Sequence, residues 1–305
     1  MIDVCLPGTG GMIPLPNRWL TCCWIEHQGA AILIDCGEGT QIAIKKAGLK
    51  PSRIELLLIT HFHADHISGL PGLLLTLANV PRTAPLTIAG PPGLGKIVSA
   101  LTVITPRLPF PLEIIELNHK SEQPPPPLER GGLSVTSLSM RHGMTCLGYR
   151  VDLFRKPIFN PQKAAALDIP VKLYKVLHAG ETVTLPDKRV ITPEQVLDGE
   201  RKPISICYFT DTRPFIQMSE FAKNVDLLIS EGMYYDEEMR QKTEEKKHMM
   251  FLDSAKLAAK CGAKRLWLTH YSPALERPKD GVHIAKRVFP YIIAAHDGIQ
   301  LTIDK

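Results

Sequence analysis

The chain contains the run His61-Phe62-His63-Ala64-Asp65-His66, which directly follows an apolar stretch at residues 54–60. This run carries three imidazoles and one carboxylate without a thiolate. Such nitrogen and oxygen donors suit Zn²⁺, Mn²⁺ or Fe at a catalytic centre, whereas structural zinc usually draws on cysteine. Side chains alternate along an extended segment, so His61 and His63 point the same way. A helix that begins after them can direct Asp65 and His66 at a second ion, and the run therefore predicts a binuclear metal site.

Three other short apolar stretches also end on residues that can bind a metal. Residues 133–140 lead to His142, residues 204–209 lead to Asp211, and residues 265–269 lead to His270. Each stretch has the length and composition of a buried strand. Open α/β sheets bind their ligands beyond the carboxyl ends of strands. One such residue alone is equally well explained as a cap or turn residue, but four strand ends together indicate a metal centre.

Several motifs occur in the order of a known family and span nearly the whole chain. They are Leu6-Pro7-Gly8-Thr9-Gly10-Gly11, Asp35-Cys36-Gly37-Glu38-Gly39-Thr40-Gln41, the histidine run continued by Ile67-Ser68-Gly69-Leu70-Pro71-Gly72-Leu73, His142 with Gly148-Tyr149-Arg150, Thr210-Asp211-Thr212-Arg213-Pro214, and Leu268-Thr269-His270-Tyr271-Ser272-Pro273. With these motifs the chain resembles the metallo-β-lactamase fold and, within it, the ribonuclease Z-like endonucleases of tRNA 3′ processing. The histidine run alone indicates only the superfamily, whereas the motifs at residues 35–41, 70–73 and 211–214 point to the narrower group.

The resemblance implies an α/β (α+β) fold, a four-layer αββα sandwich with an inserted arm. It implies a single domain over residues 1–305 with two pseudo-symmetric halves, at about residues 1–150 and 204–305. Residues 151–203 would form the arm, a candidate tRNA-binding exosite. The proline-rich stretch at residues 123–132 is expected to be a stiff loop and turn.

The resemblance also implies two zinc ions and assigns their ligands. His61, His63 and His142 would hold one ion. Asp65, His66 and His270 would hold the other, and Asp65 would also accept the proton of the attacking water. Asp211 would bridge the two ions, and its charge would offset the repulsion between two dications about 3.5–4 Å apart.

Three further residues are candidates for supporting roles. His248 resembles the histidine that protonates the departing 3′ oxygen in this family, and an imidazole that titrates near neutrality suits a general acid. The alternative for His248 is an exposed residue at a helix start. Glu231 resembles the family's nearby acid, which would orient His248. Asp35 is either a hydrogen-bond acceptor for a ligand histidine or a cap for the turn that follows it.

The arm is basic in its first part. Residues 155–175 contain a single acidic residue and five basic ones, which are Arg155, Lys156, Lys163, Lys172 and Lys175. Clustered lysine and arginine can neutralise phosphates and bind RNA largely by its shape. The alternative is an ordinary solvated insertion, because the formal charge of the whole chain is only +5.

Composition agrees with an enzyme of this class. The 305 residues are 44% hydrophobic, enough for one large core or two fused cores. Seven scattered cysteines and the lack of a visible N-terminal signal predict a cytoplasmic protein. Because apolar runs stay well short of the ~20 residues that span a bilayer, no membrane association is expected. The resemblance implies a homodimer.

We therefore expect a zinc-dependent phosphodiesterase that removes the 3′ trailer of precursor tRNA and leaves a 3′ hydroxyl. The sequence leaves two alternatives open. One is a small-molecule hydrolase of the same fold, acting on cyclic nucleotides, other phosphodiesters, sulfate esters or lactones. The other is a non-catalytic RNA-binding relative. Met249-Met250 after His248, residues 169–174 of the arm and Asn17-Arg18-Trp19-Leu20 depart from the family pattern, and all three places concern the handling of substrate.

Overall fold

The computed structural model describes residues 1–105, 107–121 and 123–304. The chain divides into two compact units, one made of Met1–Asp152 with Ser205–Lys305 and the other of Leu153–Ile204. The larger unit is built on two seven-stranded sheets.

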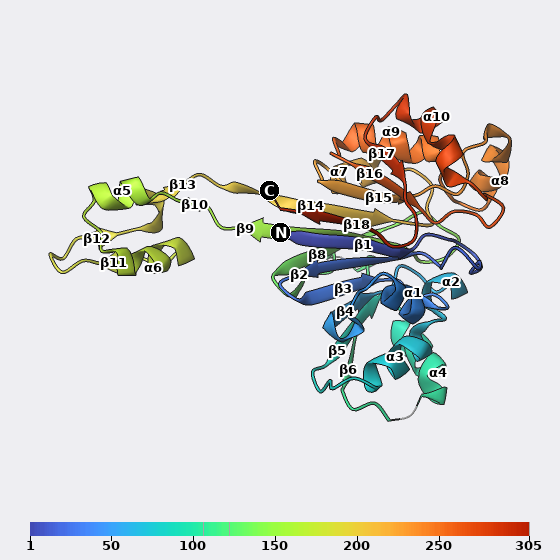
Figure 1. Ribbon diagram of the computed structural model, residues 1–305, viewed down its shortest axis with the longest axis horizontal. Helices are drawn as coiled ribbons and strands as arrows, with labels where there is room; N and C mark the ends of the chain where they lie inside the picture. Colours follow the sequence, from blue (N-terminus) through green and yellow to red (C-terminus); the bar gives the residue numbers. More distant parts are fainter. Residues whose placement is uncertain (106, 122, 305) are drawn as a thin grey trace. The chain divides into compact units, whose positions relative to one another are not determined.

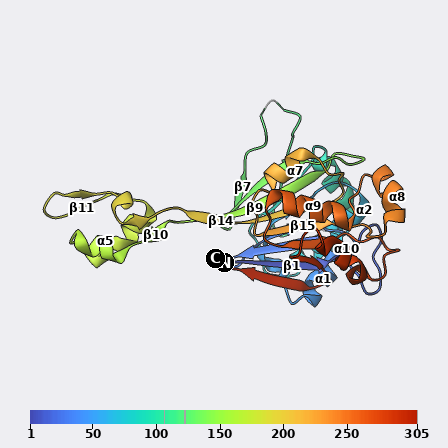
Figure 2. The same cartoon turned by 90° about the horizontal axis from the view of Figure 1, so that it is seen from above.

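The first sheet has the strand order β18-β1-β2-β3-β4-β5-β6. Its strands are β1 (Ile2–Gly8), β2 (Cys22–His27), β3 (Ala30–Ile34), β4 (Ile54–Leu58), β5 (Leu86–Gly90), β6 (Leu112–Glu116) and β18 (Ile299–Ile303). The four strands from β3 to β6 are parallel, whereas β18, β1 and β2 add on antiparallel. Ile2 pairs with Ile303, so the two ends of the chain lie side by side (Figure 2).

The second sheet has the order β17-β16-β15-β14-β9-β8-β7. Its strands are β7 (Leu128–Arg130), β8 (Leu133–Ser139), β9 (Leu147–Arg155), β14 (Arg201–Phe209), β15 (Leu227–Glu231), β16 (Leu266–Thr269) and β17 (Ile292–Ala294). The strands from β14 to β17 are parallel, and β7, β8 and β9 are antiparallel to one another. Both sheets thus combine four parallel strands with three antiparallel ones.

Helices cover the outer face of each sheet (Figure 1). The helices of this unit are α1 (Thr40–Lys46), α2 (Ala64–Ile67), α3 (Leu70–Ala78), α4 (Leu94–Leu101), α7 (Ile216–Phe221), α8 (Arg240–Glu245), α9 (Phe251–Cys261) and α10 (Val282–Lys286), with short 3₁₀ turns at Pro51–Arg53, Thr102–Ile104, Glu237–Met239 and Pro278–Gly281. Strands β5, β15 and β16 are buried at every position, as expected for strands that are covered on both faces. The predicted four-layer α/β sandwich is confirmed.

The sheets do not divide the chain at residues 150 and 204, where the sequence placed the limits of the two halves. Strands β7 to β9 belong to the second sheet although they precede residue 156, and β18 belongs to the first. The reason is that β9 lies beside β14, so the hairpin of β8 and β9 extends the second sheet. The expected loop at residues 123–132 also contains a short strand, β7, because β8 offers it a pairing edge; Glu122, just before this loop, lies outside the described residues.

The smaller unit, Leu153–Ile204, has its own secondary structure. It contains β10 (Ile158–Phe159) paired with β13 (Leu197–Asp198), β11 (Val183–Thr184) paired with β12 (Val190–Ile191), α5 (Pro161–Ala166), α6 (Tyr174–Ala179), and 3₁₀ turns at Val171–Leu173 and Pro193–Gln195. A small apolar cluster is buried inside it, made of Ala164, Ile169, Leu177, Val183, Leu185, Ile191 and Val196. The insertion is therefore a small folded unit with a core of its own.

Candidate metal centre and active site

Four strands from the two sheets end at one place. His61 follows β4 of the first sheet, whereas His142, Asp211 and His270 follow β8, β14 and β16 of the second. Buried hydrogen bonds link the sheets just before these ends. The Tyr149 hydroxyl donates to the Ile59 carbonyl at 2.6 Å, and the Thr21 and Thr269 hydroxyls are 2.8 Å apart. The strand ends are thus held together by the protein itself.

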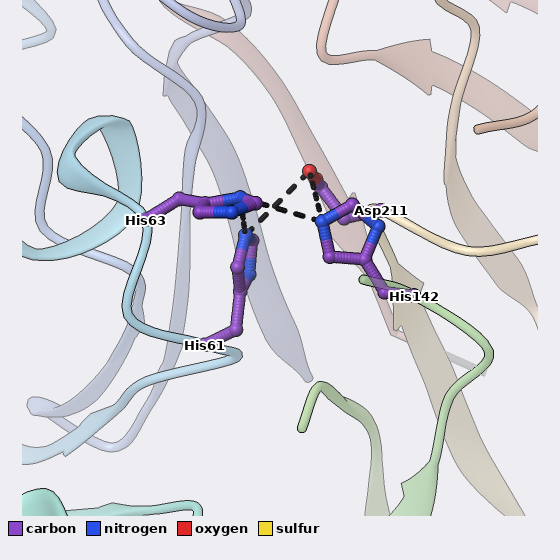
Figure 3. A group of neighbouring side chains, drawn as sticks. All are labelled: His61, His63, His142 and Asp211. Carbon is purple, nitrogen blue, oxygen red and sulfur yellow. Dashed lines mark hydrogen bonds and ion pairs between the residues drawn. The ribbon is translucent and has the colours of Figure 1, made fainter. Parts of the chain in front are cut away.

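The first group of donors comprises His61, His63, His142 and Asp211, whose ligand atoms lie within 4.8 Å of one another. Figure 3 shows these side chains turned toward one another from three separate segments. His63 Nδ1 is 2.9 Å from His61 Nε2 and 3.3 Å from His142 Nε2. Asp211 Oδ2 is 3.6 Å from His61 Nε2 and 3.8 Å from His142 Nε2. His63 is exposed and His142 is half-buried, so this group forms the open side of the centre.

The second group comprises Asp65, His66 and His270. The Nε2 atoms of the two histidines are 3.2 Å apart, and Asp65 Oδ2 lies 3.5 Å and 3.4 Å from them. Asp211 faces this group with its other oxygen, since Oδ1 is 3.3 Å from His66 Nε2 and 3.2 Å from His270 Nε2. One carboxylate therefore stands between the two groups and presents one oxygen to each.

The donor atoms fit a metal better than they fit one another. Among the described residues, the buried Oδ1 of Asp211 makes no hydrogen bond, although two imidazole nitrogens lie within 3.3 Å of it. Buried carboxylate oxygens are rarely left unsatisfied, and lone pairs that converge in this way suit a cation. The same carboxylate draws protons to its neighbours. Burial by itself lowers the pKa of His66 and of His270, but the carboxylates around them, Asp211 first, together raise both pKa values above the ordinary value.

Two buried residues, Asp35 and Thr60, form a chain of hydrogen bonds with the side of His66 that faces away from the centre. His66 Nδ1 is 2.7 Å from Asp35 Oδ2, and Asp35 also accepts hydrogen bonds from the backbone N–H and the hydroxyl of Thr60. Helix α1, which follows the Asp35 turn, has Gly39 at its N-cap and no side-chain cap. The Asp35 carboxylate therefore faces His66 rather than capping the helix, an arrangement that fixes the tautomer and direction of the imidazole.

Glu231 and His248 form a pair at the edge of the centre. His248 Nδ1 is 2.8 Å from Glu231 Oε2, and the other oxygen of Glu231 accepts the backbone N–H of Thr212 at 2.7 Å. Burial lowers the pKa of His248, but the neighbouring Glu231 carboxylate outweighs this effect and raises it. Burial raises the pKa of Glu231, and His248 in turn brings it below the ordinary value.

Glu231 and His248 also belong to a third group of possible ligands, together with Asp211 and His270. In this group Glu231 Oε2 lies 3.6 Å from His270 Nδ1. A neutral imidazole binds a metal through one nitrogen, and His270 Nε2 already faces Asp65, Asp211 and His66. Glu231 is therefore better placed to accept a hydrogen bond from His270 Nδ1 than to hold a third ion.

The sequence did not predict three contacts at the centre. The backbone N–H of Met12, a residue with φ of 68°, donates to Asp65 Oδ2 at 2.7 Å. A Cβ on the neighbouring Gly11 would lie 2.8 Å from His270 Cε1, so this loop can approach the centre only with glycine there. The third contact is that of Arg213 with the His248 carbonyl, at 2.9 Å. Backbone groups make all three contacts, and only the glycine at position 11 hints at one of them.

The centre opens into a cavity of about 860 Å³. Lys242, Lys246 and Lys247 line it on the side of α8 and the loop that follows. Apolar side chains also line it, namely Met12, Ile13, Met233, Pro273 and Ala274. Asp65, His63, His142 and His248 are exposed to the same cavity. The cavity lining therefore combines basic and apolar side chains.

The five basic residues predicted to contact RNA lie in the smaller unit and differ in their surroundings. The Arg155 guanidinium donates to the Lys202 carbonyl, and Lys163 Nζ pairs with Asp198 at 2.7 Å. Lys156, Lys172 and Lys175 are exposed, and no ion pair is found for them within residues 1–105, 107–121 and 123–304. These three lysines are the ones free to meet an anion.

Comparison with known proteins identifies the class and then the family. The model of the metallo-β-lactamase superfamily matches residues 21–152, and that of a β-lactamase superfamily domain matches residues 160–271. With its two-sheet fold and its histidine and aspartate donors, the protein is a metal-binding hydrolase of the metallo-β-lactamase superfamily. It is 46% identical to ribonuclease Z of Lachnospira eligens over 100% of this chain and 99% of the relative. It is also 46% identical to ribonuclease Z of Agathobacter rectalis over the full length of both. The chain belongs to the ribonuclease Z family of metal-dependent endoribonucleases.

A solved structure agrees at the level of the fold. The human tRNase Z, short form, superposes with a TM-score of 0.71 and covers 99% of this chain and 100% of its own, at 24% identity. The predicted family and the predicted class of enzyme are confirmed by these comparisons. The structure contains no helix that is long and apolar enough to span a membrane within its described residues.

Proposed function

We propose that this protein removes the 3′ trailer of precursor tRNA by hydrolysing one phosphodiester bond and leaving a 3′ hydroxyl on the tRNA. Two facts support the proposal, membership of the ribonuclease Z family and the placing of Asp211 between two groups of donors. The position of Asp211 between the two groups is the stronger support, because a binuclear centre for phosphodiester hydrolysis requires a residue placed in this way.

The residues suit two zinc ions per chain, with Mn²⁺ or Fe as alternatives. His61, His63 and His142 would hold one ion, and Asp65, His66 and His270 the other, with Asp211 shared. All donors are nitrogen or oxygen atoms, and the unsatisfied Oδ1 of Asp211 favours a cation beside it. When bound, two such ions lower the pKa of a water and stabilise negative charge on the phosphate oxygens.

Asp65 would accept the proton of the attacking water. Its Oδ2 is held by the Met12 N–H and faces the two histidines, while no hydrogen bond to Oδ1 is found among the described residues. Oδ1 is therefore the oxygen able to take a proton, and Asp65 borders the cavity that admits a phosphodiester. As the water oxygen bonds to phosphorus, the proton passes to this carboxylate.

His248 would donate a proton to the departing 3′ oxygen. A ribose oxygen is a strong base and leaves slowly as a free anion, so a proton supplied at this point speeds the reaction. Glu231 holds Nδ1 of His248, which leaves Nε2 for the substrate. Because the Glu231 carboxylate raises the pKa of His248, it favours the protonated form that a general acid needs.

Exposed lysines of the smaller unit would contact the body of the tRNA. Lys156, Lys172 and Lys175 lie outside ion pairs of the described chain, and neutralising phosphates with such residues gives binding that weakens with salt. The lysines that line the cavity favour an RNA substrate over a small apolar ester in the same way. Arg155 and Lys163, which already have partners, would contribute less.

The working form would be a cytoplasmic homodimer. Exposed apolar side chains on neighbouring elements support a second copy as partner, namely Ile42 of α1, Leu75 of α3, and Val103 and Ile104 of the turn Thr102–Ile104. The cysteines of the described chain are all free and buried, which agrees with a reducing compartment. Light scattering on the purified protein would return twice the 33.8 kDa chain mass if the dimer is correct.

The test of the proposed function is direct. Zinc-loaded protein is incubated with a 3′-extended precursor tRNA and, separately, with bis-p-nitrophenyl phosphate. We expect a single cut just after the discriminator base, and we expect Asp65→Ala to abolish it. Turnover of the small ester with the RNA left intact would contradict the proposal and indicate a small-molecule hydrolase.

A further inference from the structure

The polar groups of His248 are almost all held by the protein. Its backbone N–H donates to the Thr243 carbonyl at 2.9 Å, and its Nδ1 lies 2.8 Å from Glu231 Oε2. Its own carbonyl accepts from Arg213 Nη1 at 2.9 Å. Only Nε2 lacks a hydrogen-bond partner among the described residues, and His248 lines the cavity. The direction of Nε2 is therefore set by three contacts, of which Arg213 makes one.

The turn that carries His248 needs such support. Lys247, the preceding residue, has φ of 59°, a backbone conformation that L-residues other than glycine rarely adopt. Strained residues of this kind persist only where their surroundings impose the conformation, and they gather at functional sites. Two hydrogen bonds support this turn. Lys247 Nζ donates to the His142 carbonyl, and Arg213 Nη1 donates to the carbonyl of His248, the next residue.

Arg213 connects this turn to the segment of the bridging carboxylate. It lies two residues after Asp211, and its backbone N–H donates to the Arg141 carbonyl at 3.0 Å, next to His142. Its Nη2 donates to Glu244 Oε1 at 2.9 Å, and its Nη1 is 3.8 Å from Asp253 Oδ2. The guanidinium therefore links the end of α8 and the start of α9 with the strand end that bears Asp211.

We propose that Arg213 is a positioning residue for His248, an inference that rests on the proposed function. Its bond to the His248 carbonyl keeps the turn in place, so that Nε2 faces the 3′ oxygen as that oxygen leaves. Arg213 is not among the residues that line the cavity in the described part of the chain. It therefore acts through His248 and not by binding a phosphate of the substrate.

The choice of substrate separates positioning from general loss of structure. A precursor tRNA releases a strongly basic ribose oxygen, which needs a proton, whereas p-nitrophenolate is a stable anion that leaves without one. A variant that displaces His248 therefore loses more activity on the tRNA than on bis-p-nitrophenyl phosphate. A variant that damages the metal centre loses activity on both.

The experiment measures single-turnover rates on the two substrates for the zinc-loaded wild type, Arg213→Gln, Arg213→Lys and His248→Ala. We expect the tRNA-to-ester rate ratio of Arg213→Gln to fall by about 10–10²-fold, since a misplacement of about 1 Å can cost ~10²-fold. Arg213→Lys should fall less, because an ammonium keeps one of the hydrogen bonds. Arg213→Gln placed on His248→Ala should change the ratio no further, because both act through one group.

The matched control is Arg240→Gln. Arg240 lies 3.6 Å from Glu244 and 3.3 Å from Asp253, the same two carboxylates that Arg213 meets, and it does not touch His248. Its substitution should change the ratio by less than about 3-fold, within the range of a surface ion pair.

Three outcomes would contradict these proposals. An unchanged ratio in Arg213→Gln, with bound zinc retained, would overturn the positioning role. A higher KM for tRNA with an unchanged single-turnover rate would also overturn it, in favour of a phosphate contact. A wild type that cuts the ester and leaves the tRNA intact would overturn the proposed function, and this inference with it.

Discussion

The two groups of donors on either side of Asp211 differ in how the protein supports them. Asp65, His66 and His270 are backed by buried groups, since Asp35 and Thr60 stand behind His66 and Glu231 stands beside His270. His61 is also buried, and its Nδ1 lies 3.1 Å from the Thr60 hydroxyl, but among the described residues no carboxylate stands behind His61, His63 or His142 as Asp35 stands behind His66. His63 is exposed, and the carbonyl of Lys247 approaches His142 Nδ1 only at 3.4 Å.

This difference predicts that the two metals are held unequally. Groups behind a ligand histidine fix its orientation and raise its basicity, and their loss typically weakens metal binding by about 10–10²-fold. The group of Asp65, His66 and His270, here called the buried group, should therefore bind its ion first and exchange it slowly. The group of His61, His63 and His142, here called the open group, should bind its ion last. Residues of both groups line the cavity, so the unequal support would not decide which ion meets the substrate.

The largest effect should come from the residue that the two groups share. Asp211→Ala should lose both ions and lower activity by at least about 10³-fold, because several kcal/mol of charge stabilisation disappear together. Metal content per chain, measured on the dialysed variant, checks this. A variant that keeps two ions would show that Asp211 does not bridge them.

His248→Ala should slow the chemical step by ~10²–10⁴-fold and leave both groups of donors filled. The reason is that Nδ1 of His248 meets Glu231 and its Nε2 is free, so the variant removes a proton donor without removing a ligand. Single-turnover rates at saturating zinc, read together with metal content, make the measurement. An unchanged rate would mean that His248 takes no part in the chemistry.

Asp35→Asn tests the support of the buried group alone. The substitution keeps the shape of the side chain but removes the charge next to His66 Nδ1, so the dissociation constant of the first metal should rise by about 10–10²-fold. Asp297→Asn is the control, because among the described residues the Asp297 carboxylate accepts hydrogen bonds from Thr9 and Trp19 and lies outside both groups. Equal weakening of both metals by Asp35→Asn would contradict the difference between the groups.

The smallest effect should be seen away from the centre. Lys172→Ala and Lys175→Ala should each raise KM for precursor tRNA a few-fold and lower the slope of log KM against log salt by about 1. Lys163→Ala is the matched control, since Lys163 already pairs with Asp198 and should change the slope less. Equal slopes for all three variants and the wild type would remove the smaller unit from tRNA binding.

The sequence predicts the regular parts of this fold well. Strands β4, β8, β14 and β16 lie on the four apolar stretches that precede the predicted metal ligands. All four stretches are short and rich in apolar residues. Strand β7 could not be predicted, because its three residues are strand only through pairing with β8. The sheet to which β8 and β9 belong is likewise decided by a distant neighbour, β14.

The residues of the metal centre also divide into those that the sequence predicts and those that it does not. The structure brings together all seven predicted ligands, because strand ends concentrate polar side chains that a sequence reveals directly. The pairing of Glu231 with His248 came from family resemblance, since no periodicity relates residues 17 apart in a strand and a loop. Arg213 lies in the motif at residues 211–214, but its contact and that of Met12 could not be found from the sequence, because both use a backbone group that every residue offers.

The most direct test of the account is a stepwise zinc titration of the metal-free protein, with bound zinc and precursor tRNA cleavage followed in the same samples. We expect two binding phases of unequal affinity and cleavage that rises only with the second ion. Full cleavage at one zinc per chain would contradict it, because one group of donors would then be sufficient for the reaction.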